Sequence, residues 1–173
     1  MPKVLTLTLL MITFLIWGCA STYEQTSLTE PTQKLQSGRS ILIATPSNGF
    51  YETKEYSGSG RATALAVRNA FARHSNNIVV SAECDNLDCL RNSDSASFDY
   101  YVVPEILHWE DRNTEWSGKK DKLEVKVAVY DATENTALST TIISGKSKWA
   151  TFGGDHPQDL LPEPIGEYVD SLF

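Results

Sequence analysis

The chain has 173 residues, of which 41% are hydrophobic and 21% are charged, so it is long enough for one folded domain and too short for two. Its formal net charge of −7 argues against nucleic acid and anionic lipid head groups as partners, because both are negatively charged themselves. A basic protein partner stays open.

The first 18 residues have the pattern of a signal peptide. Lys3 supplies a positive charge, residues 4–17 form an apolar stretch too short to span a bilayer comfortably, and Gly18 and Cys19 follow. The run Leu-Ile-Trp-Gly-Cys at 15–19 resembles the lipobox of bacterial lipoproteins, in which the peptide is cut before the cysteine and the cysteine is acylated. The resemblance implies a covalent lipid on Cys19 and no other cofactor. An ordinary secretory signal and an uncleaved anchor are the alternatives.

Removal of residues 1–18 leaves 14 basic and 22 acidic residues, a net charge of −8. Ala20 and Ser21 follow the cysteine, and the Asp that retains lipoproteins in the inner membrane is missing there. By resemblance to this sorting pattern, we expect the protein on the periplasmic face of the outer membrane of a Gram-negative bacterium. A Gram-positive host stays open.

Residues 19–39 are rich in Thr, Ser, Gln and Glu without a periodic apolar pattern, which predicts a lipidated cysteine followed by a flexible tether. Part of this segment adding an edge strand is the alternative. The folded domain is then expected over residues 40–173.

The domain begins with an apolar run at 41–44, which predicts a strand buried on both faces. A long loop is expected at 45–60, a helix at 61–74, a second buried strand at 78–80 and a short helical turn between 84 and 97.

Three strands follow, at 100–109, 122–129 and 137–149, and the second alternates as a sheet with one wet face should. In the first, Leu107 and Trp109 are expected on one face and His108 and Glu110 on the other. Ile165, Tyr168, Val169 and Leu172 have the spacing of an amphipathic closing helix. The order β-α-β-(α)-β-β-β-α predicts an α/β fold of α+β character, with one mixed sheet packed against helices.

Cys84 and Cys89 are the only cysteines besides Cys19. In an oxidising periplasm a local disulfide is favoured over a redox or metal role, because the spacing is not Cys-x-x-Cys and no histidine lies nearby in the sequence.

Two segments are candidates for chemistry. The run Ser-Gly-Ser-Gly at 57–60 before a helix is typical of a capping loop, with an anion cradle as the alternative. His108, Trp109, Glu110, Asp111 and Arg112 form the densest cluster of reactive side chains. On a strand His108, Glu110 and Arg112 share one face, and a solvated hairpin stem with cross-strand charge pairs is favoured over a metal or hydrolase site.

Packing is favoured for Trp109 and Trp116, with stacking on a sugar or peptide as the alternative. Asp155 suits a helix N-cap before Pro157, and the sequence leaves open whether Asp155 and His156 approach the 108–112 segment in space. Neither a catalytic set nor a metal site follows from these residues.

His-Trp-Glu-Asp-Arg at 108–112, Glu-Trp-Ser-Gly at 115–118, Gly-Gly-Asp-His-Pro-Gln-Asp-Leu-Leu at 153–161 and the 51–60 loop resemble the DUF4823 family of small Gram-negative lipoproteins of unknown function. The resemblance implies a lipoprotein and assigns no catalytic residue. The element order is also similar to periplasmic domains of lipoproteins that activate cell-wall synthases or help to build secretion channels, and a fold does not fix a function.

The sequence therefore predicts a membrane-anchored envelope lipoprotein that is not an enzyme and binds another envelope protein. The alternative is a periplasmic enzyme, or a protein that binds a small ligand or glycan through the region of His108 to Arg112.

Overall fold

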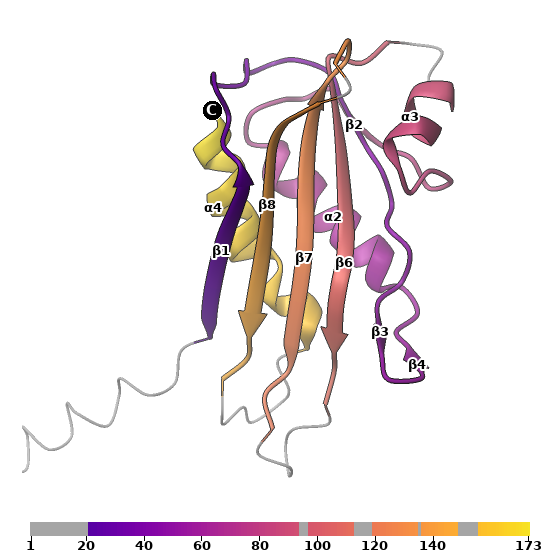
Figure 1. The fold of residues 1–173 in the computed structure, drawn as a ribbon, viewed down its shortest axis with the longest axis vertical. Helices are drawn as coiled ribbons and strands as arrows, with labels where there is room; N and C mark the ends of the chain where they lie inside the picture. The colour runs from indigo at the N-terminus through magenta and orange to yellow at the C-terminus, as the bar shows by residue number, and fades with distance from the viewer. Residues whose placement is uncertain (1–20, 94–96, 113–118, 135, 149–155) are drawn as a thin grey trace, which may run out of the picture.

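The computed structural model describes residues 21–93, 97–112, 119–134, 136–148 and 156–173. Six strands form one mixed sheet in the order β1-β8-β7-β6-β2-β5 (Figure 1). They are β1 (Thr22–Thr29), β2 (Ile41–Ile43), β5 (Ile78–Val80), β6 (Tyr100–Glu110), β7 (Lys122–Asp131) and β8 (Ala137–Lys146). The expected fold class is confirmed.

The sheet has a short parallel part and a long antiparallel part. β2 pairs in parallel with both β5 and β6, whereas β6, β7, β8 and β1 pair antiparallel in succession. The parallel pairing of β2 with β5 follows from the crossover through helix α2 (Ser59–Phe71), since parallel neighbours need such a connection.

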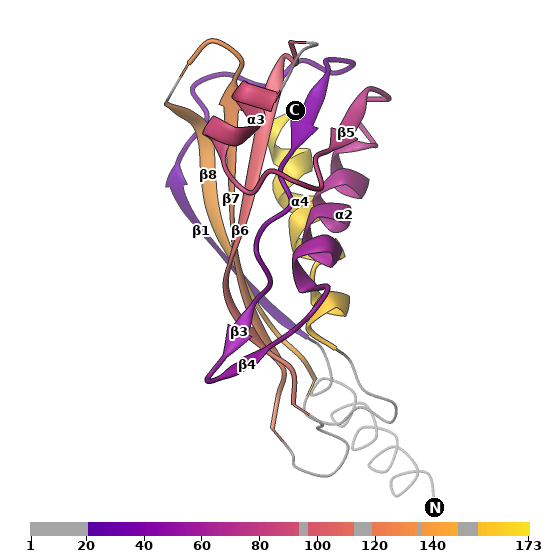
Figure 2. The same cartoon turned by 90° about the vertical axis from the view of Figure 1, so that its right-hand side faces the viewer.

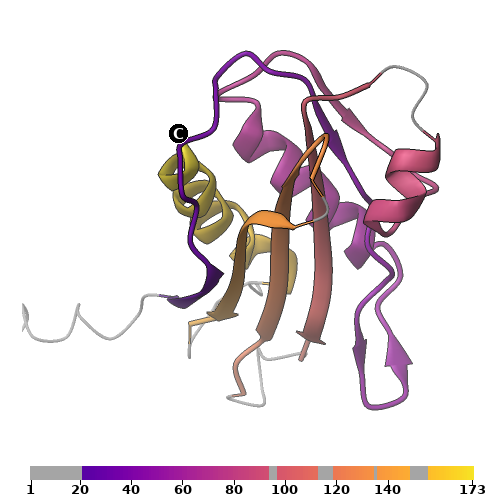
Figure 3. The same cartoon turned by 45° about the horizontal axis from the view of Figure 1, so that its top comes forward.

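The two longer helices, α2 and α4 (Pro162–Leu172), lie side by side on one face of the sheet (Figure 2). Between them and the sheet lies the main core, in which Phe71, Val127 and Ile165 are fully buried. The short helix α3 (Leu87–Ser93) covers Leu42 and Tyr101 on the other face, near the end of the sheet where β6 begins (Figure 3).

The predicted tether is wrong over Thr22–Thr29, which forms β1 at the edge of the sheet and pairs antiparallel with β8. The edge-strand alternative describes this part of the chain. Leu35 is also buried, and its N–H donates to the carbonyl oxygen of Leu172. Only one long edge and part of one face of β1 are covered, so the strand needs no run of apolar residues and gives no apolar pattern.

Three further expectations need correction. The 45–60 loop contains a hairpin of two short strands, β3 (Phe50–Tyr51) and β4 (Lys54–Glu55). β5 is an edge strand with an exposed Val79, so it is not buried on both faces. The pairing of β6 with β7 shifts register between Ile106 and His108. A bulge interrupts the alternation of faces, and Leu107 is therefore 41% exposed while Trp109 is 2% exposed.

Candidate functional site

The candidate residues gather at the end of the sheet where β6 ends and β7 begins. β2 pairs with β6 only as far as Val102, and beyond that point the hairpin β3–β4 lies beside β6. Gly49, just before the hairpin, lies so close to Trp109 that an added β-carbon would come within 2.5 Å of the Trp109 β-carbon. The absence of a side chain at this position lets the hairpin pack against the tryptophan.

Glu110 is the buried centre of an ion cluster. Its side chain is only 2% exposed, and its carboxylate accepts a hydrogen bond from Nε of Arg112. Nε2 of His108 lies 3.2 Å from the second carboxylate oxygen, and Nζ of Lys122 on β7 lies 3.5 Å from the same atom. The prediction that His108, Glu110 and Arg112 share a face is confirmed, but the expected solvated stem is wrong at Glu110.

The protein environment holds Glu110 in its charged form. Burial by itself would raise the pKa of Glu110, but the hydrogen bonds with His108 and Arg112 and the charges of Lys122 and Arg112 outweigh it, so this pKa lies below its ordinary value. The hydrogen bond to Glu110 also raises the pKa of Arg112. A carboxylate held ionised by two cations and by hydrogen bonds from its neighbours is poorly suited to act as a general acid.

Tyr51 and Lys122 are members of this cluster that the sequence did not reveal. The Tyr51 hydroxyl accepts a hydrogen bond of 2.8 Å from Nη2 of Arg112, and its ring lies 5.3 Å from the guanidinium carbon. The ring also meets His108 edge-on at 5.6 Å. The sequence pattern places Tyr51 in a loop, 61 positions before Arg112. The only sign of its role was an aromatic side chain close to the loop glycine Gly49.

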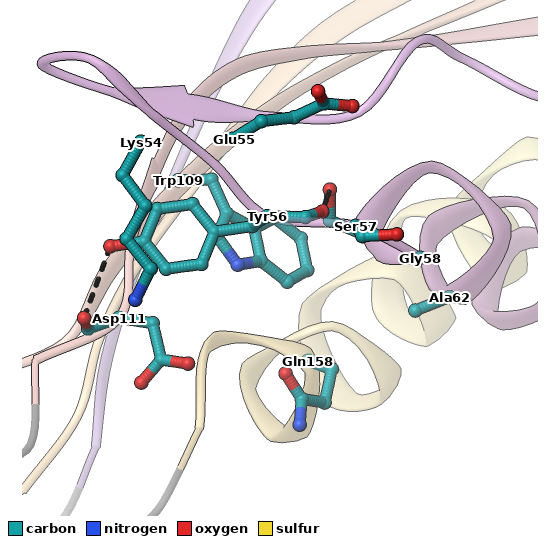
Figure 4. A pocket seen from close by; sticks show the side chains of 10 residues that line it. Lys54, Glu55, Tyr56, Ser57, Gly58, Ala62, Trp109, Asp111 and Gln158 are labelled. Carbon is teal, nitrogen blue, oxygen red and sulfur yellow. Dashed lines mark hydrogen bonds between the residues drawn. The ribbon is translucent and has the colours of Figure 1, made fainter.

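Asp111 and His156 lie close together, an approach of His156 that the sequence left open. Nδ1 of His156 lies 3.3 Å from Oδ1 of Asp111, and the backbone carbonyl of Asp111 accepts a hydrogen bond of 3.1 Å from the Tyr56 hydroxyl (Figure 4). Asp111 and Glu110 have different partners, so the structure divides the 108–112 segment into two separate groups.

A cleft of about 450 Å³ lies between the hairpin, the start of α2 and the end of β6. Tyr56, Trp109, Asp111 and Gln158 lie around it, and Nζ of Lys54 is 4.4 Å from the centre of the Tyr56 ring (Figure 4). Trp109 lines the cleft but is buried, so it presents no open face for stacking on a sugar. Trp116 and Asp155 lie outside the described residues.

The amides of the 57–60 run are already occupied. The N–H groups of Gly58 and Gly60 both donate to the side-chain oxygen of Asn48, and the N–H of Ser59 donates to the carbonyl of Tyr56. The run therefore starts α2, as the capping interpretation requires, and its amides are not directed at an anion. Helix α2 begins at Ser59, two residues earlier than expected.

The N-cap expected at Asp155 cannot be compared, but the next residue takes this role. His156 precedes the 3-10 helix η1 (Pro157–Leu160), and its N–H donates to the Asp159 carboxylate in a capping box. The capping box supports the expectation that this segment is a helix entry.

Cys84 and Cys89 are joined by a disulfide at the opposite end of the sheet, beside α3. Cys19 lies outside the described residues. Within the described part of the chain, no helix is long and apolar enough to cross a membrane, and no group of three or more His, Cys, Asp or Glu side chains is placed to hold a metal ion.

The fold and the site define a class of protein. It is a single α/β domain in which the charged side chains of the candidate site bond to one another, beside a small polar cleft. The chain belongs to the family described as a domain of unknown function, DUF4823, whose model matches residues 33–172. The predicted family resemblance is confirmed.

Solved structures with a similar fold include two of a PelC dodecamer from Paraburkholderia phytofirmans. One has a TM-score of 0.61 and 12% identity, covering 88% of this chain and 97% of that one, and the other has a TM-score of 0.59 and 11% identity, covering 88% and 95%. Protein XCC0632 of Xanthomonas campestris, of family DUF330, has a TM-score of 0.52 and 13% identity, covering 87% and 93%. At these identities the likeness concerns the fold alone. No curated protein matches the sequence.

Proposed function

We propose that this protein is a lipoprotein anchored by Cys19 on the periplasmic face of the outer membrane, and that its domain is a non-enzymatic module for assembly with envelope proteins. The observation that carries the proposal is the apolar N-terminal stretch ending in Gly18 and Cys19. Ala20 and Ser21, in place of an Asp, support the outer membrane.

The side chains most suited to catalysis support a structural role instead. Glu110 is buried and bonded to its neighbours, and His108 and Arg112 are directed at it rather than at a cavity. Oriented in this way, they offer a substrate no free nucleophile or acid–base group.

The surface best suited to assembly is the outer edge of β1. This strand ends the sheet on one side, and most of its residues are exposed, including Leu28 at 55%. An edge strand presents unpaired backbone groups that a strand of another chain can pair with. The related fold of PelC occurs in a dodecamer, which supports assembly as a use of this architecture.

Mass spectrometry of the protein isolated from native envelopes tests the anchor. The expected mass is that of a chain beginning at Cys19 with a diacylglyceryl group, and a Cys19→Ser variant is expected in the soluble fraction. An unmodified chain that keeps residues 1–18 would refute the proposal.

Photocrosslinking from the sheet edges tests assembly. A crosslinking residue at Leu28 on β1 is expected to give a discrete larger product in native envelopes, while the same residue at Val79 on β5 is the matched control on the other edge, 45% exposed. Products at neither position, or equal products at both, would contradict assembly through β1.

A second candidate function, binding of a small polar ligand, is favoured by the cleft around Tyr56 and Asp111. Substituting Gln158, which lines the cleft and is exposed, by Trp fills this space without touching the ion cluster. If the cleft is the working site, Gln158→Trp reproduces the phenotype of the deletion strain. If assembly is the function, it does not.

A further inference from the structure

The start of β1 fixes which end of the domain lies nearest to the anchor. Thr22 is the first residue of β1, and only two residues separate it from Cys19, so the three steps between them reach about 11 Å at full extension. In the sheet, Thr22 is paired with Lys146 of β8, Lys146 with Lys122 of β7, and Lys122 with Glu110 of β6. This row of four residues is therefore held close to the leaflet that receives the lipid.

Lysines are concentrated at this end of the molecule. Eight lysines remain after position 18, and five of them lie in the two segments where β7 begins and β8 ends. We call these five the lysine end: Lys119, Lys120, Lys122, Lys146 and Lys148.

Two of these lysines face each other in a way that folding alone does not favour. Lys122 and Lys146 are directly opposite on neighbouring antiparallel strands, where like charges destabilise a sheet. Lys122 has Glu110 at 3.5 Å, whereas no carboxylate among the described residues forms an ion pair with Lys146. An unpaired charge kept at such a position points to a negatively charged partner outside the domain.

Three acids at the same end are withdrawn from the surface, whereas Asp159 and, on the hairpin β3–β4, Glu52 and Glu55 are exposed. Glu110 and Asp121 are buried at 2% and 1% exposure, and Asp111 is half-buried beside His156. Over the described residues 110–112, 119–122, 146–148 and 156–159 there are six Lys and Arg against four Asp and Glu. The mature chain as a whole has a net charge of −8, so the two counts have opposite signs.

We propose that the lysine end docks on the anionic phospholipid head groups of the leaflet that holds the Cys19 lipid. The proposal rests on the anchor of the proposed function, and it revises the expectation from net charge that anionic lipids are not partners. The anchor brings the lysines within a Debye length of the surface, where each one strengthens binding about fivefold. The domain then lies on the membrane with α4's C-terminus and α3 directed away from it.

Lysine labelling on vesicles tests this orientation within one chain. The lipidated mature protein is reconstituted into vesicles of phosphatidylcholine alone, or of phosphatidylcholine with phosphatidylglycerol, and treated with an amine-reactive acetylating reagent. We expect labelling of Lys122 and Lys146 to fall at least fivefold on the anionic vesicles. Lys34, which bonds to the carbonyl of Ser171 at the other end, is expected to label equally on both. High salt is expected to restore the labelling.

The outcomes separate the anchor from the docking surface, because the same spectra report the lipid on Cys19. A lipidated chain with equal labelling of Lys122 and Lys146 on both vesicles refutes the docking surface and keeps the anchor. If the chain is unlipidated and sediments with the anionic vesicles but not with the neutral ones, the anchor is refuted and the docking surface is kept. A Lys146→Gln variant, which leaves the Glu110 cluster intact, is expected to reduce the difference between the two vesicles.

Discussion

The two ends of the sheet are stabilised by different kinds of interaction. At the end beside α3, the Cys84–Cys89 disulfide and an apolar cluster around Leu42 and Leu90 fasten the chain. At the lysine end, the carboxylate of Glu110 and the cations around it fasten it instead. The first end depends on the redox state, and the second depends on charge. The same domain is therefore expected to respond to different conditions at its two ends.

The largest effect is expected from removing the buried carboxylate. Glu110→Ala leaves Arg112 and His108 without their anion, and we expect a loss of about 3 kcal/mol in the free energy of unfolding, measured by urea denaturation. Glu105→Ala is the matched control on the same strand, because Glu105 pairs with Lys126 in an exposed position and its loss is expected to be below about 1 kcal/mol. Similar losses in both variants would show that the burial of Glu110 contributes nothing.

The next largest effect is expected at the other end. Replacing both Cys84 and Cys89 by Ser opens a six-residue loop, and the chain-entropy model gives a loss of about 2 kcal/mol. Reductant is expected to lower the urea midpoint of the wild type to that of the variant and to leave the variant unchanged. If reductant destabilises the double variant as well, the disulfide is not the origin of the effect.

A smaller effect is expected on the pH dependence of stability. The folded-state pKa of Glu110 is lowered, so its contribution is present above the ordinary Glu value and is lost as the pH falls through the folded pKa. The Glu110→Gln variant is therefore expected to lose less stability than the wild type as the pH falls below about 4.5. Urea midpoints across pH measure this difference.

Asp99 offers the comparison at the other end of the sheet. Hydrogen bonds from the side chain and backbone of Ser40 lower its pKa, so it acts in the same direction, but its side chain is 39% exposed. Asp99→Asn is expected to flatten the acid dependence less than Glu110→Gln. The reverse order would contradict the view that charge matters more at the lysine end.

Patterned segments of this sequence are readily predicted. The alternation of β7 and the helical spacing from Ile165 to Leu172 require one buried and one wet face, and both elements are present. β1 was missed because an edge strand covered mainly along one side can be polar throughout. The hairpin β3–β4 was missed because strands of two residues have no period.

The candidate site was predicted in composition but not in geometry. The grouping of His108, Glu110 and Arg112 followed from the two-residue period, but the bulge next to Leu107 leaves no signal in composition. Tyr51 contacts Arg112 and His108, the two neighbours of Glu110, across up to 61 positions, and no local pattern in the sequence indicates such a contact.

Pro104 makes one open stretch of the sheet unsuitable for pairing with a further strand. The edge of β6 left open beyond β2 carries this residue, which has no N–H to offer, and the hairpin stands alongside. This stretch of β6 is therefore poorly suited to pair with a further strand, whereas β1 pairs with β8 on one side only and leaves its other edge open. If the proposed anchor on Cys19 holds, subunits that join at β1 diffuse within one plane, and this confinement raises their effective concentration without any additional contact.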